Sequence, residues 1–145
     1  MPALATVTIN DGAATPVAHN FTPTDVKDAL ATWHDRASGI AIGYPRITTQ
    51  LRFPSPAKGN GVSSQDRVMR AVMKIVFPIL EVTSASTGTG IQPAPTKSYE
   101  LVFNGEFILP ERSTTQNRKD LLAFAKNYLS TAVVSSVVQD LESIY

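Results

Sequence analysis

The clearest alternation of hydrophobic and polar positions lies in Arg46–Phe53, with the sequence RITTQLRF. Every second side chain is polar, which is typical of a β-strand with one solvated and one buried face. A strand is therefore predicted over 44–53, ending before Pro54. Its polar face would carry two cations, a hydroxyl and an amide, namely Arg46, Thr48, Gln50 and Arg52.

Two longer segments show the same period. Arg67–Val82 has apolar residues at most odd positions and places Arg70 and Lys74 at even ones. Ser98–Leu109 carries its aromatic and aliphatic residues on one face. Both segments are predicted strands. Pro78 lacks an N–H group, so we expect it at a sheet edge or a bulge.

The N-terminal region predicts a β-hairpin. Ala5–Asn10 alternates and is rich in β-branched residues, Asp11-Gly12 follows, and Ala14–Phe21 can return as the second strand. An Asp-Gly pair between such runs is a good turn signal. The Ala-rich segment Thr24–Arg36 is ambiguous, and we read it as a short helix capped by its first residue.

The period changes to that of a helix after Ser113. Ser113-x-x-Gln116 resembles a capping box, an apolar stripe follows, and Ser130-Thr131 separates it from a second, valine-rich stripe. Strands followed by helices predict an α+β chain with one domain over 1–145: hairpin 1–21, sheet 44–109, helices 113–143. The helices could cover their own sheet or a neighbour's sheet, and periodicity does not separate these cases.

Composition and motifs limit the classes of function that are expected. The chain has 145 residues, 43% of them hydrophobic, a net charge of +1 and no cysteine, so a soluble protein of the cytoplasm is expected. No apolar run approaches the length of a membrane helix. Neither His19 nor His34 has a second ligand at metal-binding spacing, and both are expected to be solvent-exposed. No metal, cofactor or catalytic motif is predicted, so an enzyme is not expected.

The polar face of Arg46–Phe53 has two readings. It can be the ordinary solvated face of an antiparallel sheet. If the strand containing Arg70 and Lys74 lies beside it, four cations share a small area. Arginine and lysine hold phosphates, while Thr and Gln can read exposed base edges, so a flat sheet of this kind suits single-stranded or looped RNA.

The order of these segments resembles a known family. SYELVFNGEF and STTQNRKDLLAFAKNYLSTAVVSSVVQDL, together with the Asp-Gly hairpin, RITTQLR and RVMRAVMK, resemble the coat proteins of small single-stranded RNA bacteriophages of the levivirus type. The resemblance implies an N-terminal hairpin, a five-stranded antiparallel sheet and two C-terminal helices that cross onto a partner subunit. It also implies an intertwined homodimer, an icosahedral shell and a sheet that faces the RNA genome.

The resemblance further implies a virion protein that is assembled in the bacterial cytoplasm and that binds genomic RNA and a translational operator hairpin. A dimeric RNA-binding regulator that forms no shells is the alternative. Carried over strand by strand, the RNA-facing positions are those at alternate places in the three central strands. They are Arg46, Thr48, Gln50, Arg52, Arg70, Val72, Lys74, Glu100 and Asn104.

Overall fold

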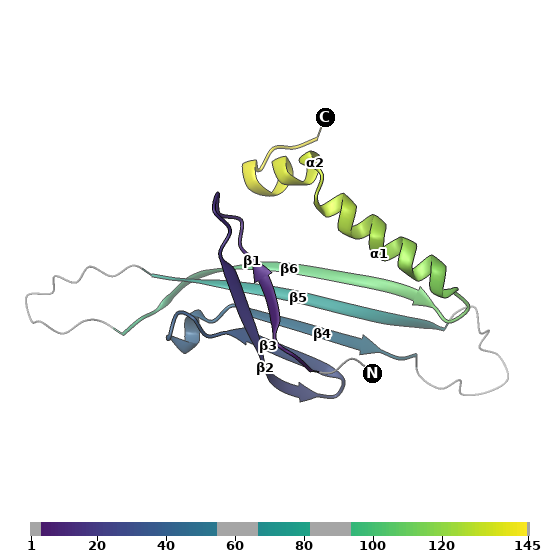
Figure 1. Cartoon of the computed structure of the whole chain (residues 1–145), viewed down its shortest axis with the longest axis horizontal. Helices are drawn as coiled ribbons and strands as arrows, with labels where there is room; N and C mark the ends of the chain where they lie inside the picture. Colours follow the sequence, from purple (N-terminus) through teal and green to yellow (C-terminus); the bar gives the residue numbers. More distant parts are fainter. Residues whose placement is uncertain (1–3, 55–66, 82–93, 145) are drawn as a thin grey trace, which may run out of the picture. The chain divides into compact units, whose positions relative to one another are not determined.

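The computed structural model describes residues 4–54, 67–81 and 94–144. Within them, six strands form one sheet in which each strand neighbours the next in sequence (Figure 1). The pairs from β1–β2 to β4–β5 are antiparallel. The strands are β1 (Val7–Asn10), β2 (Ala18–Lys27), β3 (Leu30–Asp35), β4 (Arg46–Arg52), β5 (Val68–Leu80) and β6 (Lys97–Pro110).

The predicted combination of an antiparallel sheet and two C-terminal helices is confirmed, but the strand count differs. One six-stranded sheet replaces the expected hairpin beside a five-stranded sheet. The N-terminal hairpin is its first part, because β1 pairs with β2 and β2 continues the sheet by pairing with β3. Residues 55–66 and 82–93 of the predicted sheet region lie outside the described residues.

The predicted helix over 24–36 is wrong. The segment forms the end of β2 and the whole of β3, joined by a tight turn at Asp28 and Ala29, whose φ angles are 52° and 61°. The turn contains no glycine, and alanine is unusual at positive φ. The sequence therefore carried no signal for a turn at this place. Thr24 does not cap a helix, since its hydroxyl lies 2.8 Å from His34 Nδ1 at an irregularity between β2 and β3.

The hairpin predicted at Asp11-Gly12 exists, with a longer connection than a two-residue turn. Asp11 organises the loop between β1 and β2, because its Oδ1 accepts hydrogen bonds from the backbone N–H groups of Ala13 (3.2 Å) and Val17 (2.9 Å). The Asp11 N–H also donates to the Val17 carbonyl. The aspartate thus closes the loop by accepting backbone hydrogen bonds.

Pro78 lies within β5, which has β4 and β6 as neighbours, rather than on an edge strand as predicted. The β4–β5 pairing runs from Arg52↔Arg70 to Arg46↔Val76, and Pro78 lies beyond the last of these pairs. Its missing N–H therefore leaves no gap in the ladder with β4.

The two predicted helices are α1 (Thr115–Leu129) and α2 (Ala132–Ser135), which continues as a π-helical segment over Ser136–Asp140 (Figure 1). Thr114 caps α1 by accepting from the Asn117 N–H at 3.1 Å, so the capping box expected at Ser113 is wrong by one residue. Thr131 caps α2 in the same way. The polar break at Ser130-Thr131 is confirmed.

The chain's contacts divide it into two compact units. One holds the sheet as far as Ile108, and the other holds the segment from Leu109 onward together with Arg67 and Val68. The single domain expected over 1–145 stays a prediction. Among the described residues, no single helix is long and apolar enough to cross a membrane. Only α1 and Ala132–Asp140 together, across a bend of 56°, reach that length.

Candidate nucleic-acid interface

The register between β4 and β5 brings the predicted polar residues of both strands onto one face. Residues directly opposite one another in an antiparallel pair point their side chains to the same side. We call this side the polar face. Its β4–β5 pairs are Arg46↔Val76, Thr48↔Lys74, Gln50↔Val72 and Arg52↔Arg70.

The polar face also extends over β3, which the sequence analysis missed. Thr32 lies opposite Thr48, and His34 lies opposite Arg46. Both residues belong to the segment 24–36, for which the sequence analysis predicts a helix. Their alternation was therefore not used to assign them to a sheet face. The alternation of Thr32 and His34 with Ala31 and Trp33 was the signal that could have placed them on this face.

At one end of the polar face, hydrogen bonds orient Gln50 and Arg52. The Arg52 Nε–H donates to Gln50 Oε1 at 2.7 Å, and the Gln50 amide nitrogen donates to the Asp28 carbonyl at 3.1 Å. An arginine side chain has five N–H donors, and this bond uses one of them. The guanidinium is therefore held in place with most of its donors still able to contact an anion.

At the other end, a groove of about 490 Å³ lies beside Arg46 and is also lined by His34, Tyr44, Lys97 and Glu100. Burial, reinforced by the charges of Arg36 and Arg46, lowers the pKa of His34. His34 is therefore neutral at pH 7 and contributes hydrogen bonding, while the positive charge comes from Arg46.

The third strand of the face, β6, carries one carboxylate among the predicted residues, Glu100. A hydrogen bond from Lys97 at 2.8 Å, together with the charges of Lys97, Arg46 and Lys74, lowers the pKa of Glu100. Glu100 is thus an ionised acceptor beside the cations, where it disfavours phosphate. Asn104 is exposed and lies two residues from Glu106, so by strand alternation both belong to the same side of β6.

The opposite side of the sheet, which we call the apolar face, carries Trp33, Ile47, Leu51 and Ile75. Trp33 lies opposite Ile47, and Ile47 lies opposite Ile75. In the single chain Ile75 is 38% exposed and Leu51 is 40% exposed. Among the described residues, the buried hydrophobic side chains are Phe21 and Val76, and Val76 belongs to the polar face because it pairs with Arg46. The apolar face therefore lacks the burial of a finished core.

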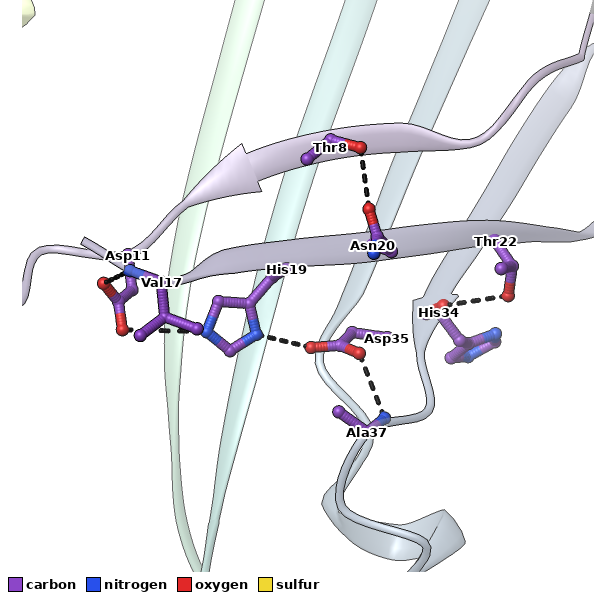
Figure 2. A network of polar contacts seen from close by, with 9 residues as sticks. All are labelled: Thr8, Asp11, Val17, His19, Asn20, Thr22, His34, Asp35 and Ala37. Carbon is purple, nitrogen blue, oxygen red and sulfur yellow. Dashed lines mark hydrogen bonds and ion pairs between the residues drawn. The ribbon is translucent and has the colours of Figure 1, made fainter.

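A polar network holds the N-terminal hairpin to the end of β3 (Figure 2). His19 lies between two carboxylates, with Nδ1 2.6 Å from Asp35 Oδ2 and Nε2 3.7 Å from Asp11 Oδ2. Asp35 is 4% exposed and also accepts from the Ala37 N–H. The hydrogen bond to Asp35 outweighs desolvation, and with the charges of both carboxylates it raises the pKa of His19.

The expectation of solvent-exposed histidines is wrong for both residues, since His19 and His34 are half-buried and hydrogen-bonded. In the part of the chain that the structure describes, no three His, Cys, Asp or Glu side chains are placed to hold a metal ion. The contact between His19 and Asp35 links the hairpin to the end of β3.

Comparison with known proteins identifies the family. The model of the family described as levivirus coat protein matches residues 2–145. The chain belongs to the levivirus coat protein family. Members of this family are structural coat proteins.

Individual relatives resemble this coat protein over its whole length. The capsid protein of Pseudomonas phage PRR1 is 25% identical over 145 residues, covering 98% of each chain. The structure of the virus-like particle of bacteriophage ESE058 is 38% identical with a TM-score of 0.87, covering 99% of this chain and 100% of that one. The virus-like particle of bacteriophage NT-214 is 27% identical with a TM-score of 0.80 and the same coverage.

Proposed function

We propose that this coat protein pairs into homodimers that assemble into a closed icosahedral shell, with the polar face bound to single-stranded genomic RNA. It would act in the virion after assembly in the bacterial cytoplasm. The observation that carries the proposal is the register of β4 and β5, which separates cations and hydrogen-bonding groups on one face from an exposed apolar face on the other. One face is suited to RNA and the other needs a protein cover.

The dimer is supported by groups that have no partner among the described residues of one chain. β6 is the last strand in the sheet order, so its outer edge offers a row of backbone N–H and C=O groups for pairing. On α1, Leu122, Phe124 and Tyr128 are 56%, 70% and 59% exposed. A second copy can add a strand at β6 and bury these side chains, because a two-fold contact presents the same patches twice.

The RNA contact is supported by the chemistry of the polar face. Arg46 and Lys74 offer charge to phosphates, which positions a strand without reading its sequence. Thr32, Thr48 and Gln50 lie between the charged positions and can hydrogen-bond exposed base edges. An operator hairpin is the finer form of this proposal, but Val72 and Glu100 offer such an RNA little. General contact with the genome is therefore the stronger form.

Relatives with solved virus-like particles support shell formation. The test is negative-stain electron microscopy of the full chain expressed alone in bacteria, with absorbance at 260 and 280 nm measured on the same size-exclusion fraction. We expect uniform closed shells with excess absorbance at 260 nm. A small dimeric species that binds RNA would instead favour the regulator that forms no shells.

A further inference from the structure

The polar face contains one position where two like charges oppose each other. Arg52 on β4 lies directly opposite Arg70 on β5. Like charges at such positions destabilise a sheet unless an anion compensates them. The compensating anion is on β6, where Glu106 Oε1 lies 3.0 Å from Arg70 Nη1.

The other cations of the face have different surroundings. Arg46 is opposite Val76, and Lys74 is opposite Thr48, so neither faces a like charge across the β4–β5 ladder. Among residues 4–54, 67–81 and 94–144, Arg70 is the cation of β4 and β5 that forms an ion pair with a carboxylate. Glu100 lies near Arg46 and Lys74, but it is already paired with Lys97 at 2.8 Å. Within the described residues, the Arg46–Lys74 end therefore keeps two uncompensated cations, whereas the Arg52–Arg70 end keeps one.

We infer that Glu106 occupies the place of an RNA phosphate at the Arg52–Arg70 end and so confines strong phosphate contacts to the end formed by Arg46 and Lys74. This inference rests on the proposed RNA function and specifies the path of the phosphodiester backbone. Both partners are accessible, since the side chains of Arg70 and Glu106 are 46% and 39% exposed. A phosphate that approaches Arg70 would meet the negative charge of Glu106, which already accepts from Arg70 Nη1.

Removing the carboxylate should therefore open a phosphate site. In Glu106→Gln, Arg52 and Arg70 lack their compensating anion, and RNA can supply it. For single-stranded RNA, one added phosphate contact steepens the slope of log affinity against log salt by about 0.7. Arg70→Gln alone should weaken binding, because it leaves the Glu106 charge exposed to RNA. The double variant removes a neutral pair and should bind like the original protein.

The experiment measures binding of a fluorescent oligouridylate to full-length protein over a range of salt, at concentrations where sedimentation shows no shells. Glu142→Gln is the matched control, because it changes net charge equally from an exposed position beyond the helices. A steeper slope and several-fold tighter binding for Glu106→Gln, absent in Glu142→Gln, would support the inference. If Glu106→Gln folds poorly, the double variant is compared with Arg70→Gln alone. Tighter RNA binding by the double variant would then show the effect of removing the Glu106 charge.

Two outcomes would overturn the inference, and they differ in whether the proposed RNA function also fails. If Lys74→Gln weakens binding but Glu106→Gln matches Glu142→Gln, Glu106 does not guard a phosphate site and the proposed function stands. If the original protein shows no salt-dependent RNA binding and Lys74→Gln changes nothing, the RNA function itself fails.

Discussion

The two faces of one sheet differ because adjacent residues of the same strands point in opposite directions. Thr48 and Thr49 show the contrast: Thr48 lies opposite Lys74 on the polar face, while Thr49 lies opposite Met73 on the apolar face. The two threonines thus have different partners because they are adjacent in the strand and therefore point to opposite faces of the sheet. Under the proposed function, β4 and β5 would each serve two interfaces, one with nucleic acid and one with protein.

The largest expected effect comes from placing a charge on each face in turn. Ile75→Asp should abolish soluble dimers, because it would place an unpaired carboxylate where a second copy buries the face, at a cost of more than about 3 kcal/mol. Val72→Asp, on the polar face of the same strand, should fold. Size-exclusion chromatography and thermal unfolding of the two variants check this. Equal behaviour would remove the distinction between the faces.

The next effect concerns RNA alone. Arg46→Gln combined with Lys74→Gln should reduce the magnitude of the salt slope of RNA binding by about 1.4, the value for two lost phosphate contacts on a single strand. The unfolding temperature should stay close to that of the original protein, since neither residue forms an ion pair within the described residues. Lys126→Gln, on α1, controls for net charge. An unchanged slope would place the phosphates elsewhere.

The two histidines should show opposite dependences on pH. The raised pKa of His19 means that its stabilisation is fully present below the ordinary histidine value of about 6.5 and is lost as pH rises through its folded value. The lowered pKa of His34 means that the unfolded state binds the proton more readily, so stability falls as pH drops below about 6.5.

Thermal unfolding of His19→Asn and His34→Asn between pH 5 and 8 measures both trends. His19→Asn should be most destabilised relative to the original protein at pH 5, with the difference shrinking toward pH 8. The stability of His34→Asn should fall less than that of the original protein as the pH is lowered from 7 to 5. Parallel curves for the two variants would contradict the assigned environments.

The smallest effect separates the neighbouring threonines. Thr49→Val should leave stability unchanged or raise it by up to about 1 kcal/mol, because a methyl group replaces a hydroxyl on the apolar face. Thr48→Val should leave stability unchanged and instead weaken discrimination between RNA sequences. Chemical denaturation and competition binding with two RNAs distinguish these results. A reversed pattern would show that the register is shifted by one residue.

Local alternation predicted much of this arrangement. RITTQLRF gave the two faces of β4 correctly, and the break at Ser130-Thr131 gave the boundary between α1 and α2. The helix prediction for 24–36 failed because alanines fit a helix locally. Pairing with β4 and the turn at Asp28 and Ala29 make this segment two strands. Pairing is a tertiary property that overrides weak propensities.

The electrostatics of the candidate site could be predicted less well than its strands. Glu106 and Arg70 are 36 positions apart, so their ion pair depends on the placement of β5 beside β6. The His19–Asp35 contact likewise joins different strands. No spacing rule connects such residues in sequence, which is why the sequence predicted the cations of the face but not which of them are neutralised.

The proposed function requires that the polar face contacts RNA and that the helices do not. Ultraviolet cross-linking of purified particles, followed by mass spectrometry of RNA-bound peptides, tests it most directly. Cross-links should concentrate in Arg46–Arg52 and in the β5 segment from Arg70 to Val76. Cross-links concentrated in α1, with none in β4 or β5, would contradict it.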